Sequence, residues 1–172
     1  MDNSYNEEMF KSKINNMMIQ ILYAEMMQNL DPVRHFLTDK LEKEFEEKII
    51  DRKKKKQRQM YDELNVSSTE IISVTFDENY YIVVAQMTIK YINYIIDLNG
   101  NYVSGNQKKR TKNDYTVTFK KTKAYKEFSL SRNCPNCGHN INVSLNGKCE
   151  YCDTIYNLED YDYIVTDIKM AK

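Results

Sequence analysis

The chain has 172 residues with 25 acidic and 25 basic side chains, so its formal net charge is zero. This length predicts one domain with a small appendage and is enough to bury a core without cross-links. The balanced charge excludes a global attraction to nucleic acid, although basic residues gather at 52–58 and 108–126. The start, MDNSYNEEMF, lacks the basic and apolar regions of a signal peptide. The longest apolar-rich run, 17–27, is too short for a membrane span of ~20 residues. We therefore expect a soluble protein.

The first third of the chain is predicted to be helical. Apolar residues recur at helical spacing from Phe10 to Ala24 and form a wide stripe that is rich in methionine. Such a stripe usually faces a core, although a Met-rich surface can also serve an adaptable partner. After a break at Asp31 and Pro32, which suit a helix start, we expect a short second helix that ends at Phe36.

A third helix is predicted from the N-cap residue Thr38 to about Arg58. Its inner side carries four apolar residues: Leu41, Phe45, Ile49 and Ile50. Its end carries six cations, Arg52, Lys53, Lys54, Lys55, Lys56 and Arg58, which suit the helix dipole. This cluster is either a solvated helix end or a contact site for anionic lipid or an acidic partner.

From about residue 67 the apolar period changes to two, which predicts antiparallel strands. One strand ends near residue 76, and a long, curved strand follows at 80–96. Asn99-Gly100 predicts a hairpin. The next strand ends near residue 119, and its polar stretch at 104–114 is either a loop or an exposed strand extension. A last strand begins near Tyr163. Helices followed by strands indicate an α+β fold, in which a curved sheet with helices on its concave side forms a cone that can enclose a pocket.

All four cysteines lie in the stretch CPNCGHNINVSLNGKCEYC, as two Cys-x-x-Cys pairs. This spacing is typical of a zinc ribbon. Gly138 follows the first pair where the chain needs an unusual dihedral, and Asn146-Gly147 predicts a hairpin between the pairs. Four thiolates make a closed tetrahedral site, so we expect a structural Zn²⁺ and no catalytic metal. The predicted ligands are Cys134, Cys137, Cys149 and Cys152.

Three other interpretations of the cysteines remain open at this point. Two disulfides would require an oxidising compartment, which nothing in the sequence indicates. An iron centre uses similar turns, and a redox-active Cys-x-x-Cys normally stands alone near a βαβ unit. A hairpin of this size cannot bury a core, so metal binding would supply its folding energy. We therefore predict three parts: helices and curved sheet at 1–132, a zinc ribbon inserted at 133–153, and a last strand returning to the sheet at 154–172.

Three stretches together resemble the Tim44-like domain: LDPVRHFLTDKL at 30–41, DLNGNYVSG at 97–105, and the ribbon followed by YIV at 163–165. This is the domain of the mitochondrial inner-membrane import-motor scaffold subunit and of bacterial relatives, and the ribbon resembles a bacterial branch. The resemblance implies a cone of helices on a curved antiparallel sheet, related to the nuclear-transport-factor-two superfamily. It also implies contact with anionic lipid and a scaffold role in protein transport. The resemblance also implies that a membrane segment often comes before the domain in bacterial relatives, and from the apolar runs of this sequence we expect none within it.

The leading hypothesis for function is a non-enzymatic scaffold that binds a protein partner, an anionic membrane surface, or both. We expect it in the cytoplasm or peripherally at the inner face of the cell membrane. An alternative is a small apolar ligand in the cone pocket, and a further one is catalysis there by a sheet tyrosine such as Tyr91 or Tyr94 with a nearby carboxylate. Nucleic-acid binding by the ribbon is disfavoured because acidic residues surround the second cysteine pair.

Overall fold

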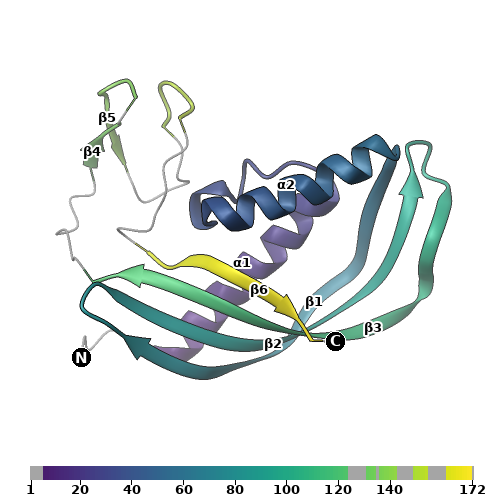
Figure 1. The fold of residues 1–172 in the computed structure, drawn as a ribbon, viewed down its shortest axis with the longest axis horizontal. Coiled ribbons are helices and arrows are strands. Elements are labelled where there is room, and N and C mark those ends of the chain that lie inside the picture. The colour runs from purple at the N-terminus through teal and green to yellow at the C-terminus, as the bar shows by residue number, and fades with distance from the viewer. Residues whose placement is uncertain (1–5, 124–130, 135, 143–148, 155–161, 172) are drawn as a thin grey trace.

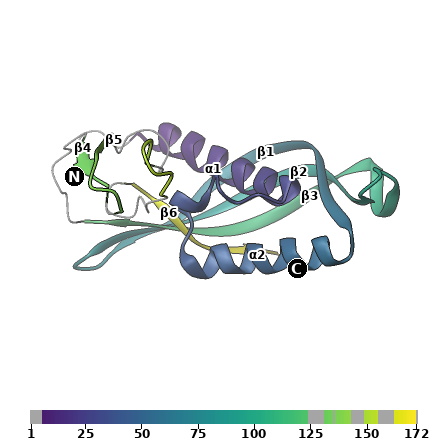
Figure 2. The same ribbon diagram turned by 90° about the horizontal axis from the view of Figure 1, so that it is seen from above.

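The computed structural model describes residues 6–123, 131–134, 136–142, 149–154 and 162–171. The chain order is α1 (Glu7–Met27), the 3₁₀ helix η1 (Arg34–Phe36), α2 (Asp39–Lys54), β1 (Gln57–Phe76), β2 (Tyr80–Asp97), β3 (Tyr102–Thr122), β4 (Ser131–Asn133), β5 (Asn140–Asn142) and β6 (Ile164–Met170). Strands β1, β2, β3 and β6 form one antiparallel sheet in that order, and β4 pairs with β5. The sheet is long and curved, with both α-helices in its hollow (Figures 1 and 2). The predicted α+β fold is confirmed.

The curvature of the sheet comes from interruptions in its ladders. The β1–β2 register shifts between Asp62 and Asn65, between Val66 and Ser68, and again after Ile71. A bulge adds residues to one strand, bends it and increases its twist. Glu63, inside the first of these shifts, has a φ of 53°. Strands of 18 to 21 residues therefore wrap around the helices instead of extending away from them.

The core lies between the helices and the concave face of the sheet. Helix α1 contributes the fully buried Ile14, Met18 and Ile21, so its methionine-rich stripe faces the core. Strand β2 buries Val83, Ala85, Met87 and Ile89 on one face, as a strand with one covered face does, and the intervening Thr88 is also buried. Other elements complete the core with Leu41, Phe45, Ile49, Val117, Phe119, Ile164 and Val165.

The end of the chain is tied to the start of α2. The backbone N–H of Thr38 donates to the carbonyl of Val165 on β6 at 3.2 Å, and Leu37 forms a parallel bridge with the same residue. Thr38 is the N-cap residue of α2, as predicted, but its hydroxyl makes no hydrogen bond with any described residue. Strand β6 lies beside β3, so the cysteine-bearing segment is inserted before the last strand of the sheet.

Several predicted boundaries were wrong. The second helix is a 3₁₀ turn that starts at Arg34 and not at Pro32. Helix α2 ends at Lys54, because Lys56 adopts a left-handed φ of 54° and the chain then enters β1. Arg58 is therefore a strand residue, and the strand starts ten residues before the predicted position. Ile50 faces solvent with 49% of its surface exposed.

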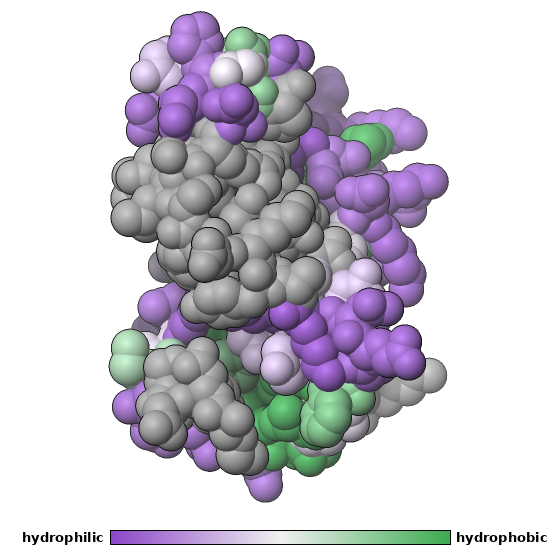
Figure 3. All heavy atoms as spheres, turned by 90° about the vertical axis from the view of Figure 1, so that its left-hand side faces the viewer, coloured by the Kyte–Doolittle hydropathy of each residue, from purple (hydrophilic) through white to green (hydrophobic). Residues whose placement is uncertain are grey.

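The polar stretch at 104–114 is the exposed strand extension, one of the two predicted possibilities. At the other end of the sheet, the turn between β1 and β2 carries exposed apolar residues, including Phe76 at 72%. Figure 3 views the molecule from this end and shows an apolar area in its lower part, with polar side chains at the top and along the right-hand side.

Candidate metal centre and the cavity beneath the helices

The four cysteines converge on one point. Their Sγ atoms all lie within 4.8 Å of one another. Cys134 Sγ is 3.7 Å from Cys152 Sγ, and Cys137 Sγ is 3.7 Å from Cys149 Sγ. A tetrahedron of sulfurs at a metal–sulfur distance of about 2.3 Å has sulfur–sulfur edges of about 3.8 Å. The four thiols are free, so this cluster could hold a metal ion.

Two matching turns position the four sulfurs. In the first turn the N–H of Gly138 donates to the carbonyl of Cys134 at 2.9 Å, and in the second the N–H of Asp153 donates to Cys149 at 3.0 Å. The residue after each pair is left-handed, with φ of 72° at Gly138 and 60° at Asp153. The unusual dihedral predicted at Gly138 is confirmed. The left-handed conformation of Asp153 could not be predicted from the sequence, because aspartate, unlike glycine, adopts a positive φ only occasionally.

The turns lower the pKa of two of the four thiols, and the thiolate is the form of cysteine that binds metal. Hydrogen bonding with the Thr154 side chain and backbone lowers the pKa of Cys152 to about 6. A hydrogen bond from the backbone of Cys137 is the main cause of a lowered pKa at Cys134. At Cys137 a hydrogen bond from the His139 backbone lowers the pKa, but burial and the neighbouring cysteines outweigh it and raise the pKa to about 12. His139 is not in the cluster; its ring stacks on Tyr151 with centroids 4.5 Å apart. The predicted hairpin at Asn146-Gly147 lies outside the described residues.

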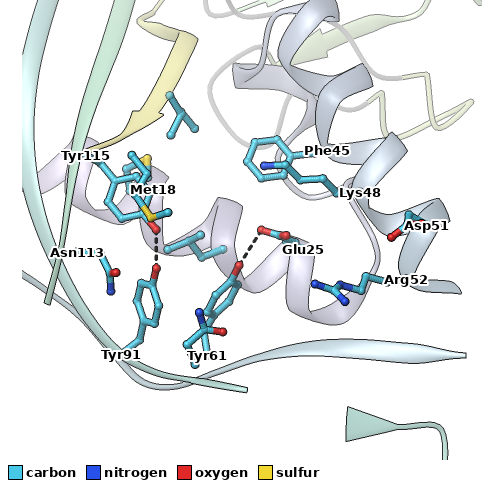
Figure 4. Close-up of a pocket in the computed structure, with 14 residues that line it drawn as sticks. Met18, Glu25, Phe45, Lys48, Asp51, Arg52, Tyr61, Tyr91, Asn113 and Tyr115 are labelled. Carbon is cyan, nitrogen blue, oxygen red and sulfur yellow. Dashed lines mark hydrogen bonds between the residues drawn. The ribbon is translucent and has the colours of Figure 1, made fainter. Parts of the chain in front are cut away.

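A cavity of about 430 Å³ lies between the helices and the concave face of the sheet (Figure 4). Apolar side chains of α1, α2 and β6 line part of it, among them Met18, Phe45 and Ile168. Its sheet side is polar. The hydroxyls of Tyr91 and Tyr115 are hydrogen bonded at 2.6 Å, and Tyr61 donates to Glu25 on α1 at 3.2 Å.

Glu25 is a partly buried charged residue of this cavity. Burial raises its pKa above the ordinary value, while the positive charges of Lys48 and Arg52 and the hydrogen bond from Tyr61 oppose the shift. Burial likewise raises the pKa of Tyr61, Tyr91 and Tyr115, so these hydroxyls stay protonated. The arrangement can hydrogen bond a small molecule that has both polar and apolar parts.

The sequence identified part of this lining. Tyr91 lines the cavity as the prediction of a pocket tyrosine requires, but Tyr94 does not, and its hydroxyl donates to Asp62 at 2.6 Å. Glu25 was missed. It follows Ile14, Met18 and Ile21 on the same helix face, and a carboxylate continuing an apolar stripe was the available signal.

The six predicted contact cations form two groups. Lys53, Lys54, Lys55 and Lys56 are exposed where α2 ends, and Arg58 is exposed on β1. Lys55 pairs with Asp51 at 2.7 Å. Arg52 differs, because it lines the cavity and donates to the Gln57 side chain at 3.4 Å. We call residues 52–58 the basic junction.

Comparison with known proteins agrees with this architecture. A family model described as the Tim44-like domain matches residues 1–132. A search of curated proteins found no match. Among the described residues, no helix is long and apolar enough to cross a membrane. The match covers most of the chain, including both α-helices, the first three strands and all of the cavity lining except Ile168 and Met170, and the chain therefore belongs to the Tim44-like domain family.

Proposed function

We propose that this protein is a non-enzymatic scaffold module that docks on the inner face of the cell membrane and holds a protein partner there, in a process of the protein-transport type. Membership of the Tim44-like family suggests a non-enzymatic scaffold role associated with membranes. The observation that carries the docking proposal is the basic junction. It concentrates six of the chain's 25 cations in seven residues of a protein whose net charge is zero.

The geometry of the basic junction supports contact with a negative surface. Among the described residues, Lys53, Lys54, Lys56 and Arg58 have no ion-pair partner, and only Lys55 is held by a carboxylate. Each cation near an anionic leaflet contributes about 1 kcal/mol. Four such residues are enough for weak, reversible docking, which high salt should weaken because exposed charges are screened.

We propose that the cysteine cluster holds a structural Zn²⁺ through Cys134, Cys137, Cys149 and Cys152. Four protein thiolates leave no open position for water or substrate, as in structural zinc sites. The ion would keep the two ends of the insertion at 133–153 together. In this proposal residues 1–132 and 154–172 form the cone, and the ribbon adds a surface for the protein partner.

The cavity supports a second candidate function, which is the binding of a small ligand. A volume of about 430 Å³ lies within the range of small-molecule sites, which are roughly 300–1,000 Å³. The Tyr91–Tyr115 pair and Glu25 would accept and donate hydrogen bonds to a polar group, while the methionines and Phe45 would contact an apolar part. A ligand that raises the melting temperature of the wild type but not of a Tyr91→Phe, Tyr115→Phe variant would support this function.

Flotation with lipid vesicles tests the docking proposal directly. The purified protein is mixed with phosphatidylcholine vesicles, with or without phosphatidylglycerol, at low and at high salt. We expect flotation with the anionic vesicles alone, and only at low salt. Equal flotation with both vesicle types, or none with either, would contradict docking through the basic junction.

A further inference from the structure

The hairpin between β2 and β3 extends past the rest of the sheet. Strand β1 begins with Gln57 opposite Asp97, so residues 98–101 continue beyond the last β1–β2 pair. The side chains around this turn include three exposed apolar ones: Leu98 at 67%, Tyr102 at 52% and Val103 at 41%. We call Leu98–Val103 the hairpin tip. It is a convex projection, and its apolar side chains have no covering element among the described residues.

The hairpin tip is held firmly by its own hydrogen bonds. The Asp97 carboxylate accepts the N–H groups of Asn99 at 2.8 Å and Asn101 at 2.9 Å, and also the Asn101 side-chain amide at 3.0 Å. These bonds, the Asn101 side chain first, lower the pKa of Asp97. The Tyr102 hydroxyl donates to the carbonyl of Gly105 at 2.8 Å. The exposure of the apolar side chains is therefore a feature of an ordered turn.

The basic junction lies directly beside the hairpin tip. Arg58 pairs with Ile96, which in turn pairs with Tyr102, so one row across the sheet joins the two features. Lys56 and the end of α2 immediately precede Gln57, the partner of Asp97. Figure 1 shows the end of α2 and the β2–β3 turn at the same end of the molecule. Asp97, at the base of the tip, keeps its negative charge because the hydrogen bonds of the turn lower its pKa, and the six cations of the basic junction outnumber it.

We propose that the hairpin tip is a membrane-insertion element, which places Leu98, Tyr102 and Val103 at the headgroup–acyl boundary of an anionic bilayer while the basic junction rests on the headgroups. This inference depends on the proposed docking function and specifies its contact surface. Apolar residues beside cations are the pattern of interfacial membrane binding, and tyrosine favours the headgroup level. The area that three side chains on a convex tip can bury is much smaller than the roughly 800 Å² that a stable protein interface buries on each partner. A lipid surface therefore suits the tip better than a protein partner does.

The opposite end of the sheet provides an internal comparison. Phe76 and Tyr81 flank the β1–β2 turn and are also exposed, but Lys123 lies over both rings, at 4.6 and 5.3 Å from their centroids. Two acids, Asp77 and Glu78, occupy that turn itself and would repel anionic headgroups, and the lysines of this end, Lys120, Lys121 and Lys123, lie on and just after β3. The hairpin tip has one acid, Asp97, beside six cations. The two ends therefore differ in charge at the point that would meet the lipid.

The absence of tryptophan from the chain makes insertion measurable. Leu98→Trp and Phe76→Trp each place one indole at one end of the sheet. On anionic vesicles we expect the Leu98→Trp emission to shift to shorter wavelength and to be quenched by brominated lipid, and the Phe76→Trp emission to stay unchanged. Leu98→Ser should lower vesicle affinity about tenfold, since it removes an inserted apolar side chain, with an unchanged circular dichroism spectrum.

The outcomes separate this inference from the docking proposal. Unchanged Leu98→Trp emission on protein that still floats with the vesicles would overturn tip insertion and leave docking by the basic junction in place. A shift at Phe76→Trp instead would overturn the inference in favour of the opposite end. Failure of both variants and the wild type to float with anionic vesicles would overturn the docking function, and the insertion proposal with it.

Discussion

Replacing Lys53 and Lys54 with glutamine should weaken binding to anionic vesicles about thirtyfold at low salt. Both lysines are exposed in the last turn of α2, and among the described residues neither has an ion-pair partner. Each contributes about 1 kcal/mol near an anionic leaflet, so the pair contributes about 2 kcal/mol, and 1.4 kcal/mol corresponds to about tenfold in affinity. Lys55 is left in place because Asp51 already neutralises it.

The same helix supplies a matched control. Lys40 and Lys43 are exposed near the other end of α2 and can be replaced by glutamine with the same change in net charge. Lys40 lies 3.7 Å from Glu44, whereas Lys43 has no ion-pair partner among the described residues. They lie about 20 Å along the helix from Lys53 and Lys54, which exceeds the Debye length of about 8 Å at physiological salt. Quantitative flotation of both double variants at two salt concentrations gives the comparison. Equal losses in the two variants, or a loss at Lys53 and Lys54 that persists at high salt, would refute the reasoning.

Three further predictions concern the ribbon, the cavity and the hairpin. Chelation should release zinc and lower the melting temperature, as Cys134→Ser should, because metal binding contributes on the order of 10 kcal/mol to small zinc modules; a melting curve that chelation leaves unchanged would contradict a structural metal. Burial raises the pKa of Glu25 above 4.5, so folding favours the protonated carboxyl group. The wild type should therefore lose stability relative to Glu25→Gln as the pH rises from below 4.5 through the raised pKa. Identical pH dependence of the two proteins in denaturant melts would contradict this. Gly105→Ala should destabilise the protein by about 2 kcal/mol or more in the same melts, because a Cβ would lie 2.6 Å from the Asn93 carbonyl oxygen at a φ of 99°, whereas Gly100→Ala, which meets no atom, should cost less.

The sequence predicted elements well where one physical pattern dominated. The stripe on α1 and the alternation on β2 each correspond to one buried face, and the cysteine spacing corresponds to one local turn repeated. It failed at the start of β1, because residues 57–65 pair with β2 across a bulge and are mostly polar or exposed, so they show no alternation. Most of the residues that line the cavity could not be predicted, because they depend on which helix faces the sheet tyrosines. Contacts between a helix and a distant strand leave no local pattern in the sequence.

The bridge between Leu37 and Val165 has a consequence for where the chain can be shortened. The family match ends at residue 132, yet β6 at 164–170 covers the free edge of β3 and holds the start of α2. A fragment that stops at residue 132 would leave β3 as an unpaired edge strand and would remove the strand partners of Val117 and Phe119. An exposed edge strand of this kind is prone to aggregation. A folding unit with a complete sheet therefore has to include β6 as well as residues 1–132, so during synthesis the sheet can close only after β6 has been made.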